Sequence, residues 1–174
     1  MYSTTYMRKL RIGWYSFTCC EDSTILFTEI LNTQWDHWKD NLEFVDARVL
    51  KTKGEMKDLD ISFVEGAIAG HDQIERLKAI RANSKTVVAI GACACTGMPA
   101  GWRNTFTEEQ KREVQFLVDR FGHLPKVEPI SVFIQVDATV PGCPMDEKQF
   151  IALVDEKILG TNSKKSAEAD LGTS

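Results

Sequence analysis

Short apolar stretches alternate along the chain with longer segments in which apolar residues recur at helical spacing. The short stretches predict strands, because they have the length and the apolar character of strands buried in a sheet. The segment 86–90, with the sequence Thr-Val-Val-Ala-Ile, is apolar on both faces, which is typical of a central parallel strand. The predicted strands are 10–15, 44–50, 61–65, 86–90 and 133–136.

The longer segments predict helices with one apolar face each, because their apolar residues lie three or four positions apart. The segment 108–121 predicts a surface helix that buries one stripe against the domain. The residues of this stripe are Val114, Leu117, Val118 and Phe121. The predicted helices are 21–31, 72–83, 108–121 and 146–159.

Strands that alternate with helices are typical of a parallel sheet covered by helices on both faces. We therefore predict an α/β fold, namely an open, flavodoxin-like, doubly wound sheet. A chain of 174 residues fits a single domain, which we place at 1–160. The segment 161–174 is rich in Ser, Lys and Ala and has few apolar residues, so we expect a flexible C-terminal tail.

Composition and charge exclude several classes of protein. Hydrophobic residues make up 43 % of the chain and charged residues 26 %, which is typical of a globular protein. A net charge of −4 disfavours a non-specific nucleic-acid binder, which needs a basic surplus. No apolar run approaches the ~20 residues of a membrane span, so we expect no transmembrane segment. The segment 1–11 contains no export signal, and we therefore expect a cytoplasmic protein.

The five cysteines are the candidates for chemistry, because thiols in a reducing compartment are more often metal ligands or catalytic groups than disulfides. Cys19 and Cys20 follow the first predicted strand, and Cys93 follows the strand 86–90. Cys143 lies just before the last predicted helix. Ligands of open α/β sheets bind beyond the carboxyl ends of the strands, so three distant loops are expected to bring thiols to one edge.

The spacing of the cysteines favours an iron–sulfur cluster over a zinc ion. Structural zinc sites usually use cysteine pairs a few residues apart, and the sequence contains no Cys-x-x-Cys. The adjacent thiols of Cys19 and Cys20 reach one ion with difficulty, whereas a cubane offers a separate iron to each of them. Zinc and thiols that bind no metal stay open as alternatives. FMN is compatible with the fold, although the sequence has neither a P-loop nor a Gly-x-Gly-x-x-Gly motif.

Four short motifs carry a resemblance to a known family. They are Phe-Thr-Cys-Cys-Glu at 17–21, Phe-Val-Glu-Gly-Ala-Ile at 63–68, Gly-Ala-Cys-Ala at 91–94 and Pro-Gly-Cys-Pro at 141–144. Together and in this order they resemble the small subunit of [NiFe] hydrogenases and the related cluster-bearing 20 kDa subunit of complex I. The resemblance extends over about 10–159, and it is the combination of motifs that makes it specific.

The resemblance implies a flavodoxin-like domain that holds the proximal [4Fe–4S] cluster next to the nickel–iron centre of a large subunit. The ligands that it implies are Cys20, Cys93 and Cys143, with one more from the first loop. Hydrogenases generally have a cysteine three residues before the one matching Cys20, and this sequence has Phe17 there. Complex I uses two adjacent cysteines instead, so we assign Cys19 as the fourth ligand.

Three further residues are possible auxiliaries of the site. Cys95 could replace Cys19 as a ligand or belong to an unusual cluster, but we favour a small buried thiol. Glu21 lies either near the cluster and the partner or simply in the first turn of a helix, where a carboxylate is favourable. Glu65 ends an apolar strand, where an unpaired carboxylate is costly. Because the family has a glutamate at this position, we favour a role for Glu65 at the cluster or the interface.

The resemblance implies the electron-transfer subunit of an oxidoreductase, which is not catalytic alone. Its partners would be a [NiFe]-hydrogenase-like large subunit and further electron-transfer subunits, since no cysteine follows Cys143. We expect a cytoplasmic location, either free or attached to a membrane through partner subunits. The alternatives are a complex I-type subunit that passes electrons towards quinone and a zinc-stabilised module without a redox role.

Overall fold

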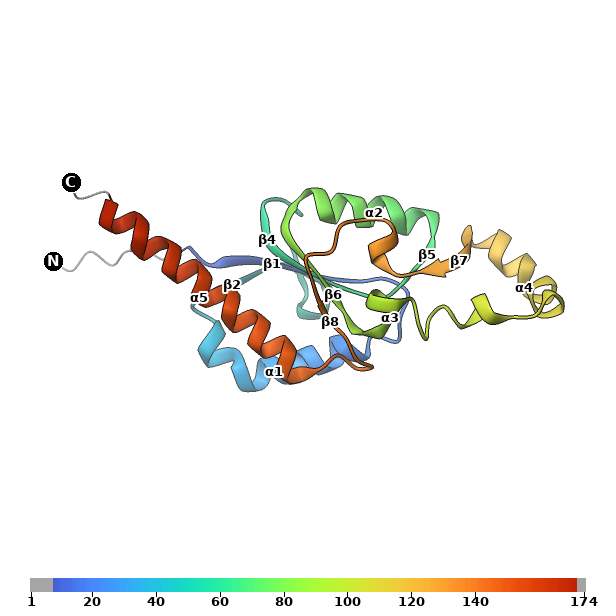
Figure 1. Cartoon of the computed structure of the whole chain (residues 1–174), viewed down its shortest axis with the longest axis horizontal. Helices are drawn as coiled ribbons and strands as arrows, with labels where there is room; N and C mark the ends of the chain where they lie inside the picture. Colours follow the sequence, from blue (N-terminus) through green and yellow to red (C-terminus); the bar gives the residue numbers. More distant parts are fainter. Residues whose placement is uncertain (1–7, 172–174) are drawn as a thin grey trace.

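A six-stranded sheet organises the computed structural model, which describes residues 8–171, with side chains as far as Gly160 (Figure 1). The strand order is β3-β2-β1-β4-β6-β8. All neighbouring pairs are parallel except β2 with β3, which is antiparallel and lies at the edge. The five parallel strands thus have the flavodoxin-like order 2-1-3-4-5 when renumbered along the chain, and the predicted fold class is confirmed. The strands are β1 (Leu10–Ser16), β2 (Leu42–Ala47), β3 (Thr52–Lys53), β4 (Leu59–Glu65), β6 (Ser84–Ile90) and β8 (Ala138–Val140).

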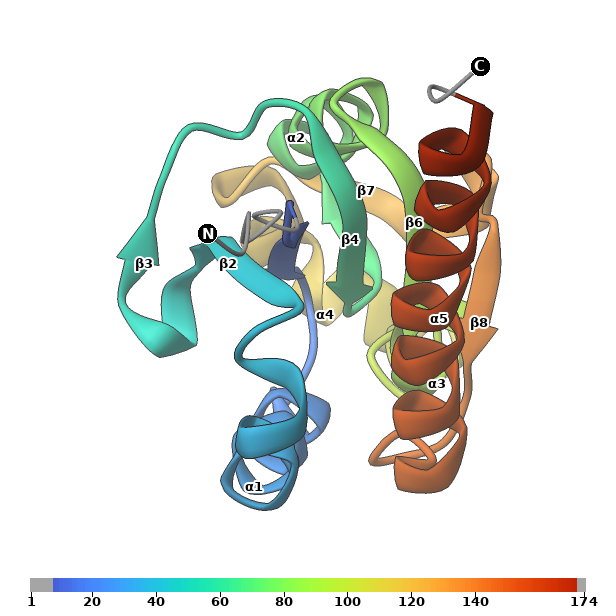
Figure 2. The ribbon, with the colours of Figure 1, turned by 90° about the vertical axis from the view of Figure 1, so that its left-hand side faces the viewer.

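Helices cover both faces of this sheet (Figures 1 and 2). Helices α1 (Asp22–Trp38) and α5 (Glu147–Leu171) lie on one face, and α2 (His71–Ala82) lies on the other. Under α1 and α5, the Trp14 ring stacks on Phe27 at 4.2 Å between centroids, and Phe150 packs edge-on against both. This aromatic centre fixes the two helices to the sheet just below the predicted site.

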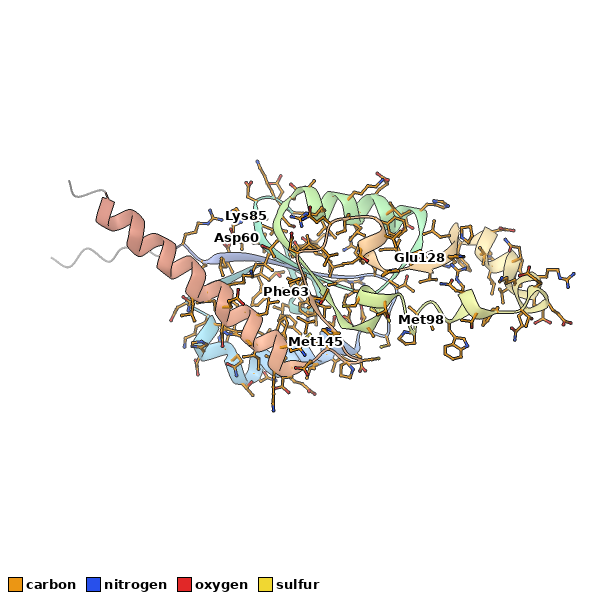
Figure 3. All side chains as sticks on the ribbon, in the orientation of Figure 1. Asp60, Phe63, Lys85, Met98, Glu128 and Met145 are labelled. Carbon is orange, nitrogen blue, oxygen red and sulfur yellow. The ribbon has the colours of Figure 1, made fainter. Side chains whose placement is uncertain are left out.

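The segment between β6 and β8 adds a small lobe to the domain. We call residues 98–128 the α4 lobe; Met98 and Glu128, at its two ends, are labelled in Figure 3. Strand β7 of the lobe pairs with β5 in a two-stranded antiparallel sheet, and α4 lies at the far end of the molecule (Figure 1). The remaining elements are η1 (Arg48–Leu50), β5 (Ile68–Gly70), α3 (Gly91–Thr96), η2 (Trp102–Thr105), α4 (Glu108–Arg120), β7 (His123–Glu128) and η3 (Ile130–Val132).

Four of the five predicted strands correspond to β1, β2, β4 and β6, whereas the fifth prediction is wrong. The segment 133–136 is irregular, and the strand that pairs with β6 is β8, a few residues later. The apolar side chains of Phe133, Ile134 and Val136 pack against the core on the α2 side instead. Their apolar character therefore reflects burial without strand pairing. The short strands β3, β5 and β7 and the helix α3 were not predicted.

The predicted buried stripe of 108–121 is also wrong. Helix α4 forms as expected, but Leu117 is 41 % exposed and Phe121 is 63 % exposed, while Val114 and Val118 are half-buried. The reason is the position of the helix: α4 lies on the lobe, away from the central sheet, and β7 is its main neighbour. The lobe is too small to bury the apolar side chains of α4, so several of them stay exposed to solvent.

Two helices are longer than predicted. Helix α1 continues to Trp38, and α5 continues to Leu171, through most of the segment that we expected to be a tail. The Ala, Lys and Glu residues of that segment are good helix formers. The division into a domain at 1–160 and a flexible tail stays a prediction. Residues 1–7 and 172–174 lie outside the described residues. They include most of the N-terminal segment in which we found no export signal and the end of the predicted tail. Within 8–171, none of the helices combines the length and apolar character needed to cross a bilayer.

Candidate functional site

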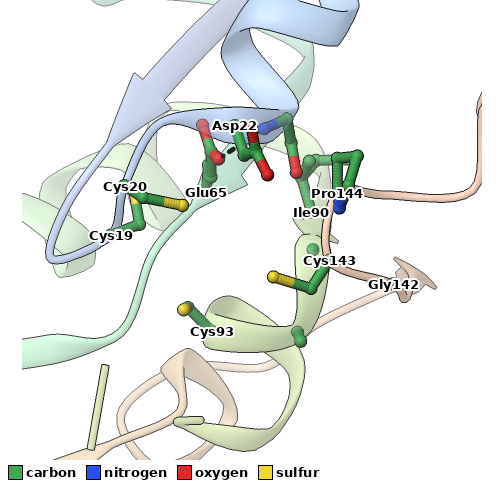
Figure 4. Close-up of a pocket in the computed structure, with 12 residues that line it drawn as sticks. Cys19, Cys20, Asp22, Glu65, Ile90, Cys93, Gly142, Cys143 and Pro144 are labelled. Carbon is green, nitrogen blue, oxygen red and sulfur yellow. Dashed lines mark hydrogen bonds between the residues drawn. The ribbon is translucent and has the colours of Figure 1, made fainter. Parts of the chain in front are cut away.

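Four parallel strands end side by side at one edge of the sheet. The register pairs Ser16 with Glu65, Glu65 with Ile90, and Ile90 with Val140. The loops that follow β1, β6 and β8 therefore begin next to one another. Together with the end of β4 they surround a shallow recess (Figure 4). Its lining residues are Cys19, Cys20, Asp22, Ser23, Glu65, Ile90, Gly91, Ala92, Cys93, Gly142, Cys143 and Pro144.

Backbone pairing to the end of β4 holds the first loop. The Phe17 N–H donates to Glu65 O at 2.8 Å, and Thr18 and Ala67 exchange backbone hydrogen bonds of 3.0 and 2.9 Å. The chain then turns at Glu21, whose φ of 62° is in the left-handed region, and α1 begins. As a result, Cys19 is half-buried and Cys20 is exposed at the rim of the recess.

The second and third loops are held by each other and by α1. Cys93 lies on α3, which follows β6 without a break, and Cys143 lies in the loop after β8. The Ala92 N–H donates to Gly142 O at 2.6 Å, which joins the two loops directly. Gly142 has a φ of +117°, and a Cβ there would lie 2.5 Å from Pro144 O, so glycine is required. The loops are therefore fixed by the folded chain itself.

Cys95 lies elsewhere, although it is only two positions from Cys93. Its Sγ donates to Ala89 O at 3.7 Å, and the side chain packs against the core on the α2 side. It does not line the recess. The structure thus brings Cys19, Cys20, Cys93 and Cys143 together and separates Cys95 from them.

Burial controls the protonation of the inner thiols. Burial, followed by the charge of Glu65, raises the pKa of Cys19 to about 12. Burial also raises the pKa of Cys93. Backbone N–H groups act in the opposite direction: that of Glu21 lowers the pKa of Cys19, and that of Ala100 lowers the pKa of Cys93. Backbone N–H groups aimed at sulfur are the contacts by which proteins stabilise metal-bound thiolates.

Glu65 is buried at the back of the recess, with 3 % exposure, and its carboxylate is fully paired with the start of α1. Oε1 accepts from the Ser23 N–H at 3.0 Å, and Oε2 accepts from Thr24 Oγ1 at 2.5 Å. Thr24 Oγ1 in turn accepts from Trp14 Nε1 at 2.8 Å. Burial raises the pKa of Glu65 in spite of these hydrogen bonds. The carboxylate is thus held in place beside the thiols.

Glu21 and Asp22 lie at the start of α1, next to the cysteine pair. Glu21 is the exposed N-cap of α1, and its side chain makes no capping hydrogen bond. Asp22 occupies the first turn instead and lines the recess. Asp22, Ser23 and Thr24 were not predicted from the sequence, although the polar run directly after the cysteine pair was the available signal.

The donor set fits an iron–sulfur cluster. Thiolates are soft ligands that favour such clusters, and a [4Fe–4S] cluster uses four of them. The recess offers four thiols, and backbone N–H groups lower the pKa of the two inner ones. In the part of the chain that the structure describes, no three His, Cys, Asp or Glu side chains are grouped for a single metal ion.

The fold and the site define the class: a flavodoxin-like domain with a cysteine-lined recess at its strand ends. The family described as NADH ubiquinone oxidoreductase, 20 Kd subunit, matches residues 19–156. The chain therefore belongs to this family of oxidoreductase subunits. The resemblance noted in the sequence is confirmed.

Curated relatives of the chain are hydrogenase subunits. A subunit of the F420-non-reducing hydrogenase vhu of Methanocaldococcus jannaschii is 31 % identical over 137 residues, which cover 71 % of this chain and 48 % of the relative. The delta subunit of the NAD-reducing hydrogenase HoxS of Cupriavidus necator is 28 % identical, covering 58 % of this chain and 56 % of the relative. The chain spans about half the length of the curated relatives that it matches.

A solved structure shares the fold. A chain in the crystal structure of a NAD+-reducing [NiFe]-hydrogenase in the H2-reduced state superimposes with a TM-score of 0.75 at 24 % identity. The match covers 88 % of this chain and 93 % of that one. A likeness at this level of identity establishes the common architecture.

Proposed function

We propose that this chain is the electron-transfer small subunit of a [NiFe]-hydrogenase-like complex, holding the proximal [4Fe–4S] cluster beside the nickel–iron centre of a large subunit. The observation that carries the proposal is the convergence of four thiols from three distant loops on one recess. Membership of the oxidoreductase subunit family and the hydrogenase relatives support the same function.

Cys19, Cys20, Cys93 and Cys143 would hold the cluster, which when bound supplies reversible transfer of single electrons. The chain has no catalytic residue of its own in this proposal, and it is one subunit of the enzyme. Its residues fix the thiols, donate N–H groups to sulfur and limit access of water. These are the means by which a protein sets the potential of such a centre.

The exposure of the ligands indicates where the large subunit docks. Cys93 is buried and Cys19 is half-buried, whereas Cys20 and Cys143 are exposed at the rim. Glu21 beside them is exposed as well. A cluster held here would face solvent on that side in the isolated chain. We therefore assign this rim to the contact with the large subunit, whose docking would exclude water.

The remaining partners and the location follow from the same proposal. Four ligands suffice for one cluster, so transfer to a final acceptor is assigned to further electron-transfer subunits. We expect the complex in the cytoplasm, either free or attached to a membrane through these subunits. Cys95 is assigned no ligand role, because its side chain packs into the core.

A complex I-type subunit is the second candidate function. It is favoured by the adjacent cysteines Cys19 and Cys20 and by the name of the matching family. The two candidates share the cluster and differ in the partner. Nickel in the partner and turnover of hydrogen distinguish the hydrogenase, whereas reduction of quinone distinguishes the complex I type.

The test is to purify the full chain with its partners under anaerobic conditions and to measure iron, acid-labile sulfide and zinc. We expect about four irons and four sulfides per chain, a brown colour that bleaches on reduction, and an EPR signal after dithionite. Nickel in the co-purified large subunit is expected for the hydrogenase. Stoichiometric zinc without iron would overturn the electron-transfer proposal.

A further inference from the structure

We infer that Asn104 is a positioning residue for the thiol of Cys93, an inference that rests on the proposed function. Asn104 belongs to η2 of the α4 lobe and does not line the recess. Its side chain closes a two-bond ring with the backbone of Val127 on β7. Nδ2 donates to Val127 O at 2.7 Å, and Oδ1 accepts from the Val127 N–H at 2.9 Å.

The first connection to Cys93 runs through Val127. Val127 is 2 % exposed and belongs to a small buried cluster that contains Cys93, Ala67 and Ala69. Cys19 and Ala100 pack against the same cluster. The two hydrogen bonds of the Asn104 side chain fix the backbone of Val127. They therefore also hold the buried apolar cluster that lies against Cys93 and Cys19.

The second connection runs through the loop from Gly97 to Gly101. The Gly97 N–H donates to Cys93 O at 2.9 Å, the Gly101 N–H donates to Gly97 O at 2.7 Å, and the Asn104 N–H donates to Gly101 O at 2.8 Å. A Cβ on Gly101 would lie 2.7 Å from Gly97 O and 3.2 Å from Asn104 Nδ2, so this loop is closely packed. Ala100 lies within this loop and packs against the buried cluster that contains Cys93. Its backbone N–H lowers the pKa of the Cys93 thiol.

The side chain of Asn104 thus fixes Val127 behind the Cys93 thiol, and its backbone N–H joins the loop that begins at Cys93. An N–H donor near a ligand sulfur stabilises the more negative, reduced form of a cluster and raises its reduction potential. Loosening the loop that carries Ala100 is expected to weaken this contact. The lobe, which lies outside the central sheet, then contributes to the redox property of the site.

The experiment compares the full chain with its Asn104→Ala and Asn104→Asp variants, each in its complex and loaded with the cluster. The alanine loses both hydrogen bonds to Val127, and the aspartate loses the donor. We expect the one-electron reduction equilibrium to shift about threefold to tenfold against the reduced form, as for loss of one hydrogen bond. A tenfold shift is 59 mV in the midpoint potential, read by EPR-monitored titration. Amide exchange of Met98, Ala100 and Gly101 is expected to become faster.

Asn83→Ala is the matched control. Asn83 Nδ2 donates to Ala79 O at 2.9 Å at the end of α2, before the amino end of β6, so its loss affects stability but not the recess. Equal potentials in wild type and both Asn104 variants would overturn the inference, as would unchanged exchange of the amides of Met98, Ala100 and Gly101. If Asn104→Ala does not load iron, the midpoint potential of Asn104→Asp is compared with that of the wild type instead, and an unchanged potential overturns the inference. A wild-type complex without a cluster would overturn the proposed function itself, which keeps the two failures distinct.

Discussion

Thr24 connects the hydrophobic core to the carboxylate at the back of the recess, and replacing it with valine tests this connection. Its hydroxyl donates to Glu65 Oε2 at 2.5 Å and accepts from Trp14 Nε1 at 2.8 Å. Valine has nearly the same shape and removes only the hydroxyl. The Trp14 N–H is then left buried without this acceptor, and Glu65 keeps its bond from the Ser23 N–H at 3.0 Å.

The expected loss of stability is large for a single hydroxyl. A buried donor without a partner costs about 1–3 kcal/mol, and a hydrogen bond to a charged group contributes about 1.5–3 kcal/mol. The two effects overlap, so we expect Thr24→Val to lower the free energy of unfolding by about 3 kcal/mol. For a chain of this size that lowers Tm by roughly 6–12 °C.

The loss should also depend on pH. Burial raises the pKa of Glu65 above its value in the unfolded chain. The folded state then holds the proton more tightly, so Glu65 favours folding below its unfolded pKa and costs stability as pH rises through its folded pKa. Removing a donor to the ionised carboxylate raises the folded pKa further. We therefore expect the deficit of Thr24→Val to be greater at pH 7 than at pH 4.5.

The assay is urea unfolding of the full chain, followed by circular dichroism at both pH values. Thr28→Val on the same helix is the control, because Thr28 Oγ1 donates to Ile25 O at 2.7 Å in an exposed position. This control should change stability by less than about 0.5 kcal/mol. A deficit of Thr24→Val that matches the control, or that is the same at both pH values, would refute the reasoning.

Two further predictions concern the ligands and the opposite end of the sheet. Cys143→Ser should lose most of the iron of the purified complex, whereas Cys95→Ser should keep it; equal iron in the two would contradict the ligand assignment. Asp60 is buried but paired with Arg11 N–H, Lys85 and Arg8, and these partners lower its pKa below the usual value. The stability that the Asp60 carboxylate contributes is therefore present above its unfolded pKa and is lost as pH falls through its folded pKa. We expect Asp60→Asn to lower the free energy of unfolding by about 1–2 kcal/mol at pH 7 and by nearly nothing at pH 2. Urea unfolding at both pH values measures this. The Lys85 and Arg8 side chains are more than half exposed, so most of this cost is assigned to the lost negative charge of the group that accepts from the Arg11 N–H.

The sequence predicted the sheet well because its central strands are buried on both faces. In β4 every residue is buried, and in β6 the last four are, which is the pattern that an apolar run encodes. The segment 133–136 was misassigned because its half-buried apolar side chains give an irregular segment the same apolar character as a strand. Whether such a segment pairs with β6 depends on tertiary packing, which no local pattern contains.

The convergence of the cysteines could be predicted from topology, whereas their surroundings could not. Strand ends meet at one edge in any parallel sheet, and this was enough to bring Cys19, Cys93 and Cys143 together. The distinction between Cys93 and Cys95 depends on the helix α3, which is only six residues long and has no amphipathic signal. The role proposed for Asn104 depends on its hydrogen bonds to Val127 on β7, more than twenty positions away. No local sequence pattern around an isolated asparagine predicts such a contact.

The contacts that hold the loops of the site also hold the domain together. Ser23 Oγ accepts from the Met145 N–H at 3.1 Å, which joins the start of α1 to the chain just before α5. The side chain of Met145 is buried in the core between these helices and the sheet. Because the same residues stabilise the fold and fix the rim, we expect the recess to form with the fold, before any group is bound. Removal of the proposed cluster should then leave the α/β fold intact, in contrast to small domains that unfold when their metal is removed. Circular dichroism of the full chain after iron removal tests this, and a loss of helical signal on removal would show that the cluster is part of the fold.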